Sequence, residues 1–179
     1  MSKGKLTVVI SQAPGKNPAK RALEENLAAS LLMEPGIELS IIPHLYDLGP
    51  DHTGRLFLES IPGDMVVLAW LFPRAAFWLL DRDGIRGTEG QSPLHPKAEK
   101  DDEDEPPPEK APGIGPVGEI PDRTIWCLDL RDHAGHQIYL EEIRRIGAEA
   151  ALLYLAIAIG ILSGFGNRLF GNAIDSASG

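Results

Sequence analysis

The chain has very little cysteine, with Cys127 the one example among 179 residues. A single thiol cannot build a disulfide framework, a zinc cage or an iron–sulfur cluster within one chain. We therefore expect no iron–sulfur cluster in this chain. The cysteine usage is typical of a reducing compartment, which predicts a cytoplasmic protein. Cys127 falls inside an apolar run, where an inert buried thiol is the expected state.

Positive charge is also scarce, because 17 lysines and arginines face 26 acidic residues and the formal net charge is −9. This balance argues against nucleic acid as a partner of the whole chain. Part of the negative charge is local, since residues 91–120 contain eight acidic residues and three lysines. The remainder of the chain carries a charge that is ordinary for a soluble domain.

Long hydrophobic runs are few. The apolar run near the N-terminus, at residues 6–10, is too short for the hydrophobic region of a signal peptide. Residues 150–162 contain no charged side chain, but runs of 10–14 apolar residues are usually buried helices, and a membrane span needs about 20. We therefore expect a helix that covers a sheet or binds a partner there. Membrane contact through residues 150–166 is the alternative.

What the chain does contain is a series of short apolar runs separated by helix-like spacers. The run at residues 65–71 is unbroken, as in a strand buried on both faces, and Pro73 then suits the first position of a helix. Similar strands are expected at 6–10, 37–42 and 124–130, and helices at 19–33, 75–80 and 137–150, with a short helix or irregular crossover at 55–61. The alternation predicts an α/β fold with a mostly parallel, doubly wound sheet of flavodoxin-like or Rossmann-like type.

One segment has a different composition. Residues 88–121 hold most of the acidic run and eight of the fifteen prolines. Such a segment cannot bury enough apolar surface to offset its conformational entropy, so we expect a disordered, acidic, proline-rich insertion. The predicted organisation is one α/β domain formed by 1–87 and 122–166, interrupted by 88–121 and followed by a flexible tail at 167–179.

Doubly wound sheets bind their ligands at the carboxyl ends of the strands, beside the point where the strand order reverses. The polar residues that follow each predicted strand are therefore the candidates for a binding crevice. These are Ser11, Gln12, Lys16, Asn17, His44, Tyr46, Asp47, Arg74, Asp129 and Arg131.

The loop at residues 11–18, SQAPGKNP, is the best candidate for an anion site. It joins a strand to a helix N-terminus, where free N–H groups and the helix dipole favour an anion, and Ser11 and Lys16 can add contacts. The loop matches neither of the two glycine-rich phosphate signatures, so the alternative is a plain turn capped by Asn17.

Three residues after the second strand, His44, Tyr46 and Asp47, are of the types used in acid–base catalysis. The alternative is that they fix a turn, with Asp47 accepting backbone N–H groups. For Trp70 and Trp78, core packing is favoured over stacking on a planar ligand. His133 and His136 have a spacing that suits a metal on a helix, but Gly135 between them indicates a turn.

The sequences IELSIIPHLYDL, GDMVVLAWLFPRAAFWLLDRDGIRG and IWCLDLR resemble the N-terminal α/β module of bacterial ferredoxin-family proteins, across about residues 5–146. In that family a cysteine-rich, cluster-binding segment follows the module, whereas residues 147–179 here contain no cysteine. No cluster ligand can therefore be transferred to this chain.

The resemblance implies a non-catalytic module that docks a redox partner or binds a small anionic ligand in the crevice. Two alternatives are a chelatase-like or flavodoxin-like enzyme that uses His44 and Asp47, and an accessory protein attached to a membrane through its C-terminus. The sequence identifies no cofactor and no metal site.

Overall fold

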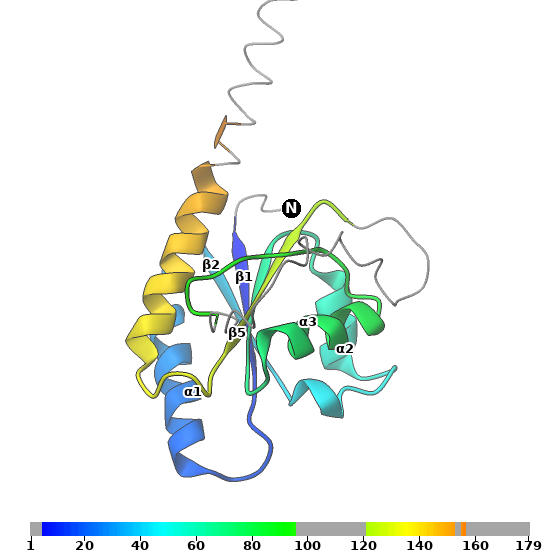
Figure 1. Ribbon diagram of the computed structural model, residues 1–179, viewed down its shortest axis with the longest axis vertical. Helices are drawn as coiled ribbons and strands as arrows, with labels where there is room; N and C mark the ends of the chain where they lie inside the picture. Colours follow the sequence, from blue (N-terminus) through cyan, green and yellow to red (C-terminus); the bar gives the residue numbers. More distant parts are fainter. Residues whose placement is uncertain (1–4, 96–120, 153–154, 157–179) are drawn as a thin grey trace, which may run out of the picture.

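The computed structural model describes residues 5–95, 121–152 and 155–156 (Figure 1). Its elements in chain order are β1 (Leu6–Ser11), α1 (Pro18–Leu31), β2 (Ile37–Ile42), the 3-10 helix η1 (Leu45–Asp47), α2 (Thr53–Ser60), β3 (Met65–Ala69), α3 (Pro73–Arg82), β4 (Thr88–Glu89) and β5 (Thr124–Asp129). A further helix covers residues 136–152.

The strands form one five-stranded sheet in the order β2-β1-β3-β5-β4. Every neighbouring pair is parallel. From β1 the chain moves to one side to form β2, then crosses to the other side to form β3. The direction of winding therefore reverses between β1 and β3, which defines the switch point of a doubly wound sheet. The predicted α/β fold is confirmed.

Helices cover both faces of the sheet (Figure 1). One apolar cluster joins α1 and the 136–152 helix to Val8, Ile10 and Leu68. The other joins α2 and α3 to Val9 and Val67. Successive residues of one strand thus enter opposite clusters, as the two-residue period of a strand requires. This explains why the central strands read as continuous apolar runs.

The element order around β3 follows directly from its sequence. All five residues of β3 are buried, and Pro73 opens α3 at a position where its missing N–H is not needed. Helix α3 buries Ala76, Leu79 and Leu80 against the sheet. The expectation that Trp78 packs in the core is wrong, because its side chain lies on the outer face of α3 and is 55% exposed.

The segment predicted as a disordered insertion begins later than expected. Thr88 and Glu89 form β4, which pairs in parallel with the start of β5, so residues 88–89 belong to the sheet. Ser92 is buried and donates a hydrogen bond to Glu142, and the His95 ring lies 3.0 Å from the Cys127 carbonyl oxygen. Residues 88–95 are therefore part of the folded domain. The rest of the predicted insertion, 96–120, lies outside the described residues.

The 136–152 helix runs beside α1 along one face of the sheet and continues past the sheet edge (Figure 1). Its own residues Tyr139, Ile143 and Ile146 are buried against the sheet in the first apolar cluster. Glu142 of the same helix is buried and bonded to Ser92 and Arg145. Beyond the sheet edge, Leu152 is exposed.

Within the part of the chain that the structure describes, no helix has both the length and the apolarity needed to cross a membrane. Most of the 150–166 segment and all of the 167–179 tail lie outside the described residues, so the expectations about them stay predictions.

Candidate functional site

The switch point lies between the carboxyl ends of β1 and β3, and two cavities flank it. One, of about 350 Å³, is formed by the β1–α1 loop and the first turns of α1. The other, of about 250 Å³, lies between α1 and the residues after β3 and β5. This is the edge of the sheet where the topology predicts a ligand.

The larger of these two cavities brings together three of the predicted site residues, Gln12, Lys16 and Asn17, and adds Arg21 from α1. The Asn17 side chain accepts hydrogen bonds from the N–H groups of Ala19 and Lys20, so it caps the helix as predicted. Two cationic side chains thus face a cavity at a helix N-terminus, in a chain whose net charge is negative.

Glu24 was not among the predicted site residues, yet it closes the crevice at the switch point. One of its carboxylate oxygens accepts two hydrogen bonds, from the Ala13 N–H at 2.6 Å and from the Trp70 indole N–H at 2.7 Å. Ala13 follows β1 and Trp70 follows β3, so Glu24 joins the two strands that flank the reversal. Lys20, one turn earlier on α1, holds its ammonium nitrogen 4.5 Å from the centre of the Trp70 ring.

The smaller cavity is lined by Lys20, Trp70, Arg131 and His133, together with apolar side chains. Arg131 makes a bidentate pair with Asp129, whose side chain is buried. The hydrogen bonds that Arg131 donates to this carboxylate raise the pKa of Arg131. The central carbon of the same guanidinium lies 4.0 Å from the centre of the Phe72 ring. The predicted residues Asp129 and Arg131 therefore form one unit at the end of β5.

Other predicted residues hold the loop after β2 in place. The Ser11 hydroxyl donates to the Pro43 carbonyl at 3.3 Å and accepts from the Leu45 N–H at 3.0 Å. The rings of His44 and Tyr46 are stacked with their centres 5.8 Å apart. The buried Ser11 hydroxyl thus links the end of β1 to the loop that follows β2.

Two predicted catalytic candidates, His44 and Asp47, line none of the three cavities described for this chain. His44 is almost fully buried, while Asp47 is exposed. Arg74 also lies outside these cavities, with its guanidinium 4.7 Å from the centre of the Trp78 ring. Cys127 is buried as predicted, and burial raises the pKa of its thiol.

No group of three or more potential metal ligands occurs among residues 5–95 and 121–152. Beside the switch point the carboxyl edge instead presents hydrogen-bond donors and cations, and the carboxylates of Glu24 and Asp129 there are already bonded. Chemically this arrangement suits an anion.

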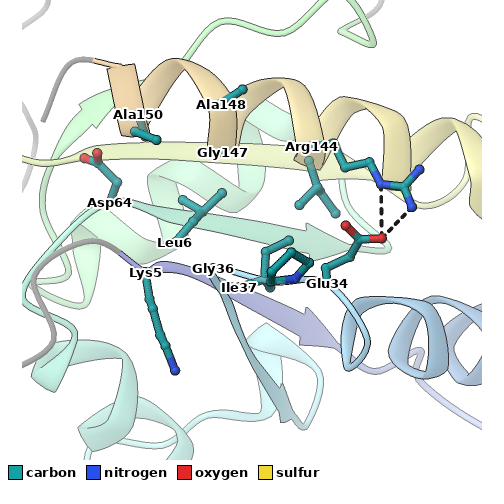
Figure 2. Close-up of a pocket in the computed structure, with 13 residues that line it drawn as sticks. Lys5, Leu6, Glu34, Gly36, Ile37, Asp64, Arg144, Gly147, Ala148 and Ala150 are labelled. Atoms are coloured by element: carbon teal, nitrogen blue, oxygen red, sulfur yellow. Dashed lines mark hydrogen bonds and ion pairs between the residues drawn. The ribbon is translucent and has the colours of Figure 1, made fainter. Parts of the chain in front are cut away.

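A third cavity, of about 330 Å³, lies at the opposite edge, beside the amino ends of β1, β2 and β3 (Figure 2). Leu6, Ile37 and the small residues of the 136–152 helix form most of its walls. Glu34 and Arg144 form an ion pair at its side, which Figure 2 marks with dashed lines. Its walls are mainly apolar, and its principal charged pair is already satisfied. It therefore lacks the convergent polar groups that mark a specific site.

Sequence reasoning missed Glu24 because the candidates were the polar residues that follow each predicted strand, whereas Glu24 lies within the helix predicted at 19–33. The available signal was the spacing of Lys20 and Glu24, which places them one above the other, next to the apolar positions of the helix. Comparisons of the chain with models of protein families, with curated proteins and with solved structures found no match.

Proposed function

We propose that the protein is a non-catalytic α/β binding module that accepts a small anionic ligand at the carboxyl edge of its sheet. The observation that carries the proposal is the cavity of about 350 Å³ beside the switch point, which holds Lys16, Arg21 and the N-terminus of α1. Charged hydrogen bonds to an anion are stronger than neutral ones, and a helix N-terminus adds favourable electrostatics.

Two features favour binding over catalysis. The residues of acid–base type, His44 and Asp47, lie away from the cavities, and Ser11 is engaged in holding the β2 loop. The polar groups that line the cavity include Gln12, Lys16 and Arg21, which donate hydrogen bonds, and the Glu24 carboxylate in its wall already accepts two.

The test is isothermal titration calorimetry with inorganic phosphate as the probe. We expect saturable binding by the wild-type chain. The double variant Lys16→Gln/Arg21→Gln is expected to raise the Kd about tenfold or more, since each lost charged hydrogen bond is worth roughly 1.5–3 kcal/mol. Arg82→Gln and Lys5→Gln together make a control with the same change of charge outside this cavity. Absence of phosphate binding by the wild type would overturn the proposal.

A second candidate is the docking of a protein partner, which the resemblance to ferredoxin-family modules predicts to be a redox protein. The observation that favours it is a pair of exposed aromatic rings, Phe72 and Trp78, each with an arginine guanidinium over one of its faces. Aromatic and arginine side chains dominate the energetics of protein interfaces. Co-elution with a small iron–sulfur protein, lost in a Phe72→Ser/Trp78→Ser variant, would support this candidate. Unchanged elution of both proteins would contradict it.

A further inference from the structure

The most specific arrangement at the carboxyl edge is the pair of donors that meet at Glu24. The Ala13 N–H comes from the β1–α1 loop and the Trp70 indole N–H comes from the end of β3, and both donate to the same carboxylate oxygen. The ammonium of Lys20 lies on the face of the same indole. Two separate segments thus donate to one carboxylate oxygen, and a cation of α1 lies against the indole that supplies one of the two donors.

We propose that this point is an oxyanion position that selects a carboxylate, and that Glu24 fills it from within the chain until an external carboxylate takes its place. The inference deepens the proposed function, since Ala13 and Glu24 are also walls of the cavity assigned there to the anion. The Glu24 carboxylate shows which kind of group the two donors fit. It is planar and singly charged, and its bonded oxygen offers one lone pair to each N–H.

When an external carboxylate displaces Glu24, the Glu24 side chain can pair with cations on the same helix. Lys20 and Arg21 stand four and three residues before it on α1, and side chains at these spacings are neighbours on a helix surface. Glu24 is also only half-buried, so its carboxylate can turn toward solvent and these cations. The two adjacent cavities, of about 350 and 250 Å³, can hold the rest of the incoming molecule. The ligand class is therefore a small organic acid.

The experiment is chemical rescue of Glu24→Ala, which removes the internal carboxylate and leaves both N–H donors in place. Glu25→Ala is the matched control, because it removes the same charge from an exposed neighbouring position. Each protein is melted in increasing sodium acetate, with sodium chloride at equal ionic strength as reference, and tryptophan emission is recorded. We expect acetate to raise the Tm of Glu24→Ala saturably by a few degrees and to shift its emission. The wild type and Glu25→Ala should show the same, smaller acetate-specific rise, because Glu24 competes with acetate for the position in both proteins.

An acetate response of Glu24→Ala no larger than that of Glu25→Ala would overturn the inference. Rescue by inorganic phosphate but not by acetate would overturn the carboxylate assignment. Should Glu24→Ala fail to fold without acetate, Glu24→Gln keeps an acceptor oxygen but loses the charge. It should then show the acetate-specific rise in Tm, and its absence would equally overturn the inference. Acetate rescue combined with no phosphate binding by the wild type would support the carboxylate position and refute the proposed function.

Discussion

Arg123 is a buried cation with an unusual set of partners. It donates one hydrogen bond to the Arg86 carbonyl and another to the Ile61 carbonyl, each at 2.5 Å, and burial lowers the pKa of its guanidinium. The two carbonyls belong to the loops before β3 and before β4. The Arg123 side chain, just before β5, therefore joins the loops before β3 and before β4 at the amino edge of the sheet.

Replacing Arg123 should consequently destabilise the whole domain. We expect Arg123→Met to lower the free energy of unfolding by about 2–4 kcal/mol, because the buried Ile61 carbonyl and the partly buried Arg86 carbonyl lose a charged donor. Arg123→Lys should give an intermediate loss, since an ammonium group cannot reach both carbonyls as a planar fork does. Urea denaturation followed by circular dichroism measures both. A loss below about 0.5 kcal/mol in Arg123→Met would show that the carbonyls find other donors.

Some residues of the candidate site could be predicted from the sequence, and others could not. Lys16 and Asn17 could be predicted because neighbouring residues alone determine where α1 begins, with Pro18 at the first helical position. The bond between Glu24 and Trp70 joins residues 46 positions apart. It depends on β3 lying beside β1, and no local pattern encodes that adjacency.

At the scale of elements, the long central strands and their helices were predictable, and the short β4 was not. β4 pairs through only two residues, and the prolines and acids that follow dominate the composition of its surroundings. Its position is set by tertiary packing, since Gly90 lies directly against the ring of Trp126. The intrinsic propensity of such a short segment is a weak guide when packing decides its conformation.

The packing of Gly90 gives a direct test of this element. A Cβ atom at Gly90 would lie 2.4 Å from the Trp126 ring, whereas one at Gly49 would meet nothing within 4 Å. We expect Gly90→Ala to lower the free energy of unfolding by about 1–3 kcal/mol through overpacking. Gly49→Ala should stay within about 0.5 kcal/mol of the wild type. Equal stabilities of the two variants would mean that residues 88–95 do not pack on β5.

For the whole molecule, the sheet was predictable because its central strands β1, β3 and β5 are largely buried, which leaves a composition that a surface strand does not have. The polar ties between distant elements were not. Arg144 of the 136–152 helix pairs with Glu34 beyond the end of α1, and Glu142 of the same helix bonds to Ser92 after β4. These carboxylates join parts of the chain that are 110 and 50 residues apart. Protonating them therefore lowers the stability of the whole domain, not only of one element.

The final prediction concerns the acid stability of the molecule. Burial alone would raise the pKa of Glu142, but hydrogen bonds from Arg145 and Ser92 outweigh burial and hold this pKa below its ordinary value. Because the pKa is lower in the folded than in the unfolded chain, the stabilisation is complete above the unfolded value and is lost as the pH falls through the folded value. Glu142→Gln should therefore cost about 1 kcal/mol at pH 7 and show a weaker loss of Tm between about pH 5 and pH 3 than the wild type. Glu141→Gln, at an exposed position of the same helix, should keep the wild-type dependence. If Tm falls equally with pH in Glu142→Gln and the wild type, the link between the helix and the β4 segment contributes nothing to acid unfolding.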